Sequence, residues 1–284
     1  MNTNLNVKDM KLYTGADSII TELSALGFGP RSPLNFNEVC KIDQLHYHGA
    51  ASVQLAIDAL AIKENSHVLE IGAGWGGPSR FIAGRTKAQV TALELQNDFN
   101  SVGESITKRC GLNSFVTHRQ DDFLKVEFKN FKFEHIVSWL ALYHIPNRKF
   151  FTEKMYGLMV PGGTIFIEDL IQGSAYKDAD LEQLNKELFA NSLVDENKYL
   201  DGLRAVGFEI ISAENMASDW LEFTSKRLNI FLKNREKFIN LHGNDAFQGK
   251  KHFYSKIVEF FSDSFISGMR LVAKKIIPNT QDLS

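Results

Sequence analysis

A glycine-rich loop carries the clearest chemical signal in the sequence. It lies in the segment Val-Leu-Glu-Ile-Gly-Ala-Gly-Trp-Gly-Gly-Pro (68–78), where Gly72, Gly74 and Gly77 fit the spacing G-x-G-x-x-G. Glu94 follows Gly72 by 22 residues, at the end of the next expected strand. A carboxylate at that place accepts the two ribose hydroxyls of a cofactor that contains adenosine. The spacing therefore predicts a nucleoside site and leaves the identity of the nucleoside open.

Glu70 bears on which cofactor the loop holds. It stands two residues before the first glycine, at the carboxyl end of the expected strand 67–71, where the pyrophosphate of a dinucleotide would lie. Like charges about 4 Å apart repel by several kcal/mol at an intermediate dielectric constant, so this carboxylate disfavours a dinucleotide. It suits a cofactor whose tail carries an ammonium and no phosphate. We therefore predict S-adenosyl-L-methionine, with a dinucleotide or a purely structural turn as alternatives.

From about Asp43 to Asp169 the chain resembles the class I S-adenosylmethionine-dependent methyltransferases. The segment Glu70-x-Gly72-x-Gly74-x-Gly76 matches the first motif of that family, and Glu94 matches its ribose-binding acid. Phe133–His144 matches the fourth-strand motif, and Pro161–Gly163 matches the turn before the fifth strand. The resemblance implies a Rossmann-like, seven-stranded α/β fold whose last strand is antiparallel.

The same resemblance implies a set of cofactor contacts. Asp122 and Phe123 match the pair that holds the adenine by its amino group and by stacking, and the segment 43–49 is expected to fold over the methionine end, with His46 or Tyr47 near its carboxylate. The expected cofactor-binding residues are Glu70, Gly72, Gly74, Gly76, Glu94, Leu95, Asp122, Phe123, Trp139, His46 and Tyr47. No H-E-x-x-H or C-x-x-C motif is present, so we expect no metal.

Within that family the segment 43–49, the Gly-Gly-Pro at 76–78 and the long helical tail resemble small-molecule N-methyltransferases of the sarcosine/dimethylglycine and phosphoethanolamine types. In the phosphoethanolamine enzymes, the Tyr of an N-terminal Tyr-Thr pair and the His that ends the fourth-strand motif form a catalytic dyad. Tyr13–Thr14 and His144 match those positions. The resemblance thus implies that Tyr13 latches the active site and that His144 is its base or orienting group. An amine of pKa about 10 must lose a proton before it accepts a methyl group.

The chain also departs from these relatives. Trp139-Leu140 precede Ala141 where the relatives carry Asp, and the stretch 176–200 is mainly acidic where a phosphate-binding cluster is expected, which disfavours phosphoethanolamine. The segment 136–144 also resembles cyclopropane fatty acid synthases, except that Tyr143 replaces their Glu before the His. Methylation of carbon or sulfur in an apolar metabolite, such as a lipid, isoprenoid or polyketide, is the alternative function. A catalytically inactive binding subunit is the third.

Alternating strands and helices must position these residues. Continuous apolar runs joined by helices of about 10–15 residues favour a parallel sheet that is covered on both faces. The expected strands are 67–71, 89–95, 114–118, 133–139, 163–169, 208–213 and 266–274. The expected helices are 16–26, 37–61, 78–85, 97–110, 148–159, 178–191 and 196–205, followed by a long helical tract over 216–262.

We divide the chain into an N-terminal helical cap (1–61), an S-adenosylmethionine-binding core (62–214), a helical lid insertion (215–264) and a final core strand with its tail (265–284). The chain holds 22 Phe, and those at 28, 36 and from 223 to 265 lie outside the expected sheet. We interpret them as the apolar underside of a lid over the acceptor pocket. Other aromatic residues, including Tyr47, Tyr143 and Trp220, would enclose a quaternary cation.

Composition excludes several classes of protein. A net charge of -2 disfavours a dedicated nucleic-acid-binding protein, and the 11 basic and 7 acidic residues of 217–284 are interpreted as a solvated face. The two cysteines exclude a disulfide scaffold. No signal peptide and no run of 18 apolar residues is visible. We expect a cytoplasmic enzyme, monomeric or homodimeric, whose partner is a small-molecule methyl acceptor.

Overall fold

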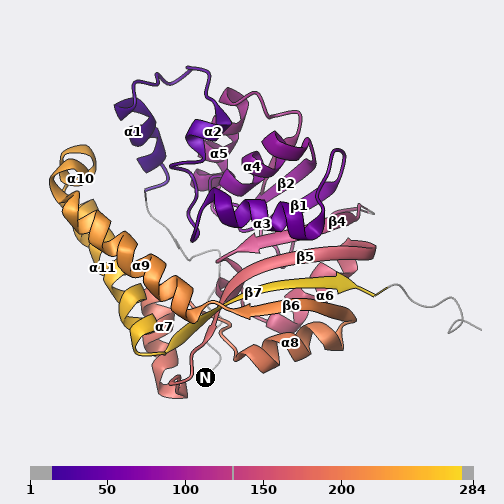
Figure 1. The fold of residues 1–284 in the computed structure, drawn as a ribbon. Coiled ribbons are helices and arrows are strands. Elements are labelled where there is room, and N and C mark those ends of the chain that lie inside the picture. Colours follow the sequence, from indigo (N-terminus) through magenta and orange to yellow (C-terminus); the bar gives the residue numbers. More distant parts are fainter. Residues whose placement is uncertain (1–14, 130, 277–284) are drawn as a thin grey trace, which may run out of the picture.

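The computed structural model describes residues 15–129 and 131–276, which are built around a seven-stranded sheet in the order β3-β2-β1-β4-β5-β7-β6 (Figure 1). Strands β1 to β5 are parallel, whereas β7 runs antiparallel to both of its neighbours, β5 and β6. The predicted Rossmann-like sheet with an antiparallel last strand is confirmed. The strands are β1 (His67–Ile71), β2 (Gln89–Glu94), β3 (Val116–Gln120), β4 (Phe133–Trp139), β5 (Met159–Gln172), β6 (Phe208–Asn215) and β7 (Ile266–Lys275).

Helices cover both faces of the sheet. Successive side chains of a strand point to opposite faces, so Leu69 and Ile71 of β1 enter one core layer and Val68 enters the other. The first layer packs against α6 (Arg148–Leu158) and α8 (Glu196–Ala205), and the second packs against α3 (Ala50–Leu60) and α4 (Gly77–Thr86). Burial on both faces explains why these strands have continuous apolar sequences.

The remaining helices before β6 lie around this core. They are α1 (Ser18–Ala25), α2 (Phe36–Val39), α5 (Asn97–Arg109) and α7 (Leu181–Leu188), with the short 3₁₀ turns η2 (Leu142–His144) and η3 (Asp178–Asp180). The expected continuous helix over 37–61 is wrong, because residues 40–49 form a loop between α2 and α3. His48 and Gly49 take positive φ angles of 58° and 51°, which end the helical path. Asp43 is drawn inward by an ion pair with Arg80.

The chain leaves the sheet between β6 and β7 to form the helical insertion, residues 217–262. It consists of α9 (Ala217–Lys233), α10 (Arg235–His242) and α11 (Asn244–Ser262), and α9 and α11 lie side by side and project beyond one end of the sheet (Figure 1). Its base is fixed by Trp220, which packs so closely on β7 that a Cβ at Gly268 would lie 2.1 Å from the Trp220 ring. Its tip, α10, reaches α1.

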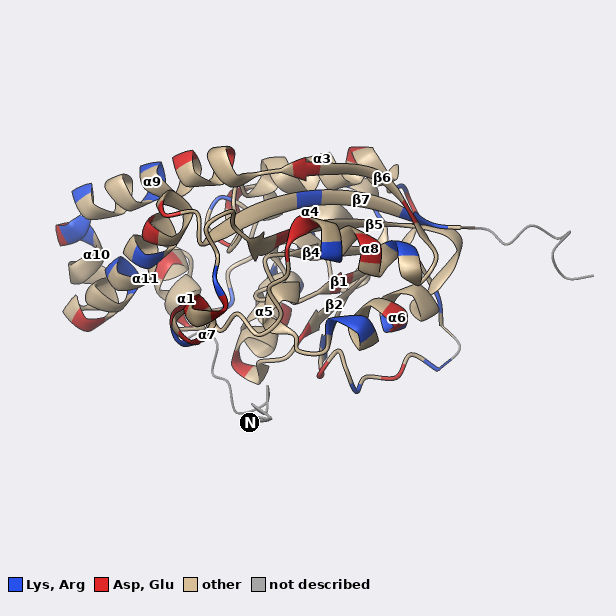
Figure 2. Cartoon of the chain, turned by 90° about the horizontal axis from the view of Figure 1, so that it is seen from below, with Lys and Arg blue, Asp and Glu red and all other residues tan. Residues whose placement is uncertain are grey.

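Charged residues are spread over the molecule rather than collected on one face. In Figure 2 both signs are interspersed along the insertion helices and along the helices that cover the sheet. None of the helices in the described part of the chain combines the length and apolar character that a membrane crossing requires.

Candidate active site

A cavity of about 650 Å³ lies beside the carboxyl ends of the parallel strands. Its walls come from the loops that follow β1, β2, β3 and β4, from the loop 40–49, from α1 and from the helical insertion. In open α/β sheets this edge is where ligands bind, because the loops that follow neighbouring strands meet there.

Two glycines of the first loop show why side chains are not tolerated there. Gly72 has φ +77°, and a Cβ on it would lie 2.2 Å from the Cβ of Ala141 in the loop after β4. Gly76 has φ +74°, and a Cβ on it would lie 2.5 Å from Cε1 of His118 on β3. Gly72 and Gly74 line the cavity. Gly76 instead lets the start of α4 pack closely against His118.

Glu94 joins the first two loops. Its Oε2 accepts a hydrogen bond from the Gly74 N–H (2.8 Å), and its Oε1 accepts one from the Gln96 N–H (2.8 Å). Burial raises the pKa of this carboxyl, while the backbone donors lower it. Leu95 lines the cavity next to it. The carboxylate therefore holds the glycine loop against the end of β2.

Asp122 and Phe123 form the wall after β3. The Asp122 Oδ1 accepts a hydrogen bond from the Leu124 N–H (2.9 Å), and its Oδ2 lies 3.3 Å from the Lys125 ammonium. The Phe123 ring lines the cavity beside it. The two residues predicted to hold an adenine thus both line the cavity.

Glu70 lies at the end of β1 and is almost completely buried. The Ser79 hydroxyl donates a hydrogen bond to its Oε2. Desolvation raises the pKa of Glu70 to about 8, and the nearby Glu94 contributes in the same direction. A cation bound beside Glu70 would favour its ionised form.

A buried ion pair fixes the loop 40–49 over the glycine loop. The Arg80 guanidinium lies 2.8 Å from Oδ2 of Asp43 and donates a 2.6 Å hydrogen bond to the Trp75 carbonyl. This contact places His46 and Tyr47, which both line the cavity. The His46 ring centre lies 5.4 Å from that of Trp139, and burial lowers the pKa of His46 to about 4.

Tyr47 and Trp139 are cavity-lining residues that also contact the helical insertion and α3, respectively. The Tyr47 ring packs against Trp220 and Phe223 of the insertion, with ring centres 5.0 Å and 5.6 Å away. The Trp139 Nε1–H donates a 2.8 Å hydrogen bond to the Ser52 hydroxyl. Tyr47 therefore lies at the contact between the loop 40–49 and the insertion.

His144 lies in η2, just beyond the end of β4, and lines the cavity. Its Nδ1 lies 3.0 Å from the Phe189 carbonyl oxygen. A carbonyl accepts and cannot donate, so Nδ1 carries the proton and Nε2 has the lone pair. Burial lowers the pKa of His144 to about 4, so the imidazole is neutral at pH 7.

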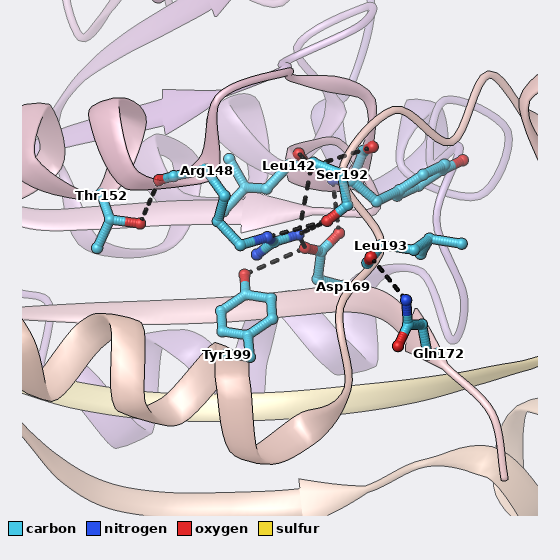
Figure 3. Close-up of polar contacts among 9 residues, drawn as sticks. Leu142, Arg148, Thr152, Asp169, Gln172, Ser192, Leu193 and Tyr199 are labelled. Atoms are coloured by element: carbon cyan, nitrogen blue, oxygen red, sulfur yellow. Dashed lines mark hydrogen bonds and ion pairs between the residues drawn. The ribbon is translucent and has the colours of Figure 1, made fainter. Parts of the chain in front are cut away.

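A polar network centred on Asp169 and Arg148 connects η2 to the elements around it (Figure 3). The Asp169 Oδ1 accepts a hydrogen bond from the Tyr143 N–H (3.0 Å), and its Oδ2 accepts one from the Tyr199 hydroxyl (3.1 Å). The Arg148 guanidinium lies 3.4 Å from the same Oδ2 and donates to the Ser192 carbonyl (3.0 Å from Nε). The network ties η2 to β5, α6 and α8. Sequence reasoning missed it, although a charged residue inside the apolar run of β5 was a signal.

The helical insertion contributes charged residues that sequence reasoning also missed. Arg227 and Lys250 line the cavity. Lys250 is exposed, whereas Arg227 is half-buried with its Nε enclosed, so the interpretation of this stretch as a solvated face does not describe Arg227. His242 at the tip lies 2.7 Å from Glu22 of α1, and both line the same cavity.

Tyr13, the predicted latch, lies outside the described residues. Among residues 15–129 and 131–276, no three His, Cys, Asp or Glu side chains are grouped as metal ligands would be.

Comparison with known proteins relates the chain to methyltransferases. A family model described as mycolic acid cyclopropane synthetase matches residues 40–271. The chain is 27% identical over 174 residues to 24-methylenesterol C-methyltransferase 3 of Arabidopsis thaliana, covering 58% of this chain and 47% of that protein. It is 25% identical over 192 residues to phosphoethanolamine N-methyltransferase 3 of the same plant, covering 68% and 39%. The matches thus span about half the length of these curated relatives or less.

Among solved structures, a putative sarcosine dimethylglycine methyltransferase from Galdieria sulphuraria has a similar fold. The TM-score is 0.72 at 13% identity, and the alignment covers 93% of this chain and 99% of the other. At this identity the likeness shows a shared fold and says nothing of the substrate.

Proposed function

Because the chain belongs to the mycolic acid cyclopropane synthetase family, and so to the class I S-adenosylmethionine-dependent methyltransferases, we propose that it methylates the nitrogen of a small amine or amino acid. The predicted enzyme class and cofactor are confirmed by this membership. The acceptor and its reacting atom are the new elements of the proposal.

The residues around the glycine loop fit the cofactor. The acidic or basic side chains that line the cavity at the ends of β1 and β2 and in the loop after β3 all carry carboxyl groups: Glu70, Glu94, Asp121 and Asp122. Such a wall suits a cationic ligand, which favours the ionised carboxylates, and does not suit a pyrophosphate. Glu94 would hold the ribose, Asp122 and Phe123 the adenine, and Glu70 would face the ammonium. When bound, S-adenosylmethionine supplies an electrophilic methyl group.

His144 is the single observation that carries the nitrogen assignment. An acceptor amine is an ammonium near neutral pH and must lose a proton before its lone pair can attack. His144 is neutral there, and its Nδ1 contact with the Phe189 carbonyl leaves the lone pair on Nε2. It lines the same cavity as the glycine loop. We assign to His144 Nε2 the role of base or orienting group for that amine, the role that the resemblance implies.

The walls of the cavity support the same acceptor. Aromatic residues from several elements line it, among them Tyr47, Trp139 and Phe223. Aromatic faces attract a cation through the quadrupole of the ring, so they would accommodate a nitrogen that gains charge on methylation. In this proposal the helical insertion acts as the lid that excludes water from the acceptor.

A second candidate function is methylation of carbon in an apolar metabolite. The family description and the likeness to a sterol C-methyltransferase favour it, as does the apolar wall formed by Leu170, Phe253 and Ile257. This acceptor would need no ammonium to be deprotonated, so His144 would have a different part in the reaction.

An acceptor screen separates the two candidates. The purified protein is incubated with S-adenosylmethionine labelled in its methyl group and with glycine, sarcosine, dimethylglycine or ethanolamine, and in parallel with a sterol, an isoprenoid and an unsaturated fatty acid. We expect label on nitrogen, identified by mass spectrometry of the product. Transfer to no nitrogen acceptor would reject the nitrogen assignment, and transfer to carbon would establish the second candidate.

A further inference from the structure

We propose that Arg227 and Lys250 of the helical insertion form an anion subsite that holds a carboxylate or phosphate group of the methyl acceptor. This inference rests on the proposed function, since it assumes a small acceptor that enters the cavity from the side of the insertion. It adds a second recognition element, at a distance from the reacting nitrogen.

Most of the charged side chains that line the cavity have a partner, but two cations have none within the described structure. Each lining carboxylate has a polar partner, as does Lys41. The pairs are Glu22 with His242, Asp43 with Arg80, Glu70 with Ser79, Glu94 with the Gly74 and Gln96 amides, Asp121 with Arg119, Asp122 with Lys125, and Lys41 with Glu38. Arg227 and Lys250, in contrast, have neither a hydrogen bond nor an ion pair within the described parts of the chain.

The Arg227 guanidinium is held by aromatic rings instead. Its central carbon lies 4.5 Å from the ring centre of Tyr254, 5.0 Å from that of Tyr47 and 5.5 Å from that of Phe223. Contacts with ring faces position a guanidinium without using its N–H donors. Its Nε is buried and has no hydrogen-bond partner in the described structure. No hydrogen bond from its terminal Nη groups is formed in the described structure either, and these are the donors that an oxyanion in the cavity would contact.

Lys250 lies on the same aromatic group. Its Nζ is 5.9 Å from the ring centre of Tyr254 and 5.4 Å from that of Phe238. The Tyr254 ring thus contacts both cations: the half-buried Arg227 and the exposed Lys250. A guanidinium pairs with two oxygens of a carboxylate or phosphate, and an ammonium adds a third contact as a point charge.

The helical insertion thus presents two cations, Arg227 and Lys250, to a cavity that Phe253 and Ile257 of the same insertion also line. The carboxylates of β1, β2 and the loop after β3 belong to the proposed cofactor site. An acceptor that carries an oxyanion besides its reacting amine, such as an amino acid or a phosphorylated amino alcohol, matches the two cations. A wholly apolar acceptor would leave both cations without an anionic partner.

Calorimetry on the protein saturated with S-adenosylhomocysteine tests the subsite without requiring turnover. Three probes are titrated: sarcosine with its carboxylate, phosphoethanolamine with its phosphate, and N-methylethanolamine with neither. We expect at least one anionic probe to bind tenfold or more tightly than N-methylethanolamine, and which one does so tells carboxylate from phosphate. Arg227→Gln should abolish this preference, and Arg227→Lys should retain part of it.

Lys226→Gln is the matched control, because Lys226 is exposed and pairs with Glu222 on the outside of α9. If Arg227→Gln does not fold, as judged by circular dichroism, Lys250→Gln at the exposed rim should weaken anionic binding severalfold. Equal affinity for all three probes, binding of neither anionic probe, or a preference that survives Arg227→Gln would overturn the subsite.

These results separate the subsite from the proposed function. Methylation of neutral amines with no effect of Arg227→Gln would leave the nitrogen assignment in place and reject the subsite. Binding of an anionic probe that depends on Arg227, without methyl transfer to any amine, would do the reverse.

Discussion

At the scale of single residues, His144 owes its protonation state to its buried position in the cavity wall. The Phe189 carbonyl fixes the proton on Nδ1, and burial keeps the ring neutral. His144→Gln should therefore lower kcat by about 10²–10⁴-fold, the usual contribution of a general base, with little change in cofactor affinity. Steady-state kinetics and calorimetry measure the two effects. His252→Gln, an exposed histidine of α11 that pairs with Glu187, is the control. An unchanged kcat would remove His144 from the proton transfer.

Glu70 makes cofactor binding depend on pH. With its pKa near 8 it is largely protonated at neutral pH, and the ammonium of the cofactor favours the ionised form, so binding releases a proton. Affinity for S-adenosylmethionine should rise with pH up to about 8, by at most about tenfold per unit. Calorimetry in buffers of different ionisation enthalpy counts the released proton. The Glu70→Gln variant should bind S-adenosylmethionine more weakly, and its affinity should no longer rise with pH. The same proton release in Glu70→Gln would contradict the assignment.

Residues at the carboxyl ends of the strands could be predicted from sequence, because a parallel sheet brings those ends to one edge. Glu70, Gly72, Glu94, Asp122 and His144 all line one cavity for that reason. Arg227 and Lys250 could not be predicted in the same way. Their place depends on how the insertion folds back over the sheet, and no local pattern in the sequence encodes that packing.

At the scale of elements, the tip of the helical insertion contacts α1 beside the cavity. The Glu22 carboxylate of α1 and the His242 ring of α10 are 2.7 Å apart, and the His242 side chain is 7% exposed. Glu22→Gln should weaken this contact by up to about 1 kcal/mol and raise the acceptor KM severalfold with little effect on kcat. Steady-state kinetics would measure the effects on KM and on kcat separately. Asp201→Asn, which breaks the exposed pair with Arg204 on α8 outside the cavity lining, should change neither constant. A drop in kcat alone would point to a different role for Glu22.

The boundaries of helices and strands could be predicted where the tertiary packing agrees with the local sequence pattern. The strands β1 and β4 match their expected limits, and β1 ends where the glycine-rich loop begins. The expected helix over 37–61 failed, because burial of Asp43 against Arg80 is a tertiary contact between residues 37 positions apart. Helical periodicity in the sequence does not reveal such an ion pair, and the ion pair overrode the local preference for a helix.

At the scale of the whole molecule, the half-buried His118 makes stability depend on acid. Burial lowers the pKa of His118 to about 3, and the Arg80 charge acts in the same direction. Between pH 6.5 and 4 the unfolded chain therefore binds a proton there that the folded protein does not, so stability falls as the pH falls. Over this window the wild type should lose up to about 3 kcal/mol relative to His118→Gln.

Thermal unfolding of both proteins at several pH values measures this difference. The two proteins are compared by the slope of Tm against pH. His118 also packs against Gly76 and Gly103, so the substitution will lower Tm at neutral pH as well, and absolute Tm values would mix the two effects. Slopes that are equal between pH 6.5 and 4 would contradict the linkage.

The position of β7 has a consequence for how the protein is made. This strand lies between β5 and β6, yet it follows the helical insertion in the chain. While the ribosome is still producing α9 to α11, the edges of β5 and β6 that will bind β7 stay open. Open strand edges are the part of a nascent chain most prone to aggregation. The emerging polypeptide thus carries an incomplete sheet until its last strand arrives, and a chaperone that shields strand edges is most useful in that interval.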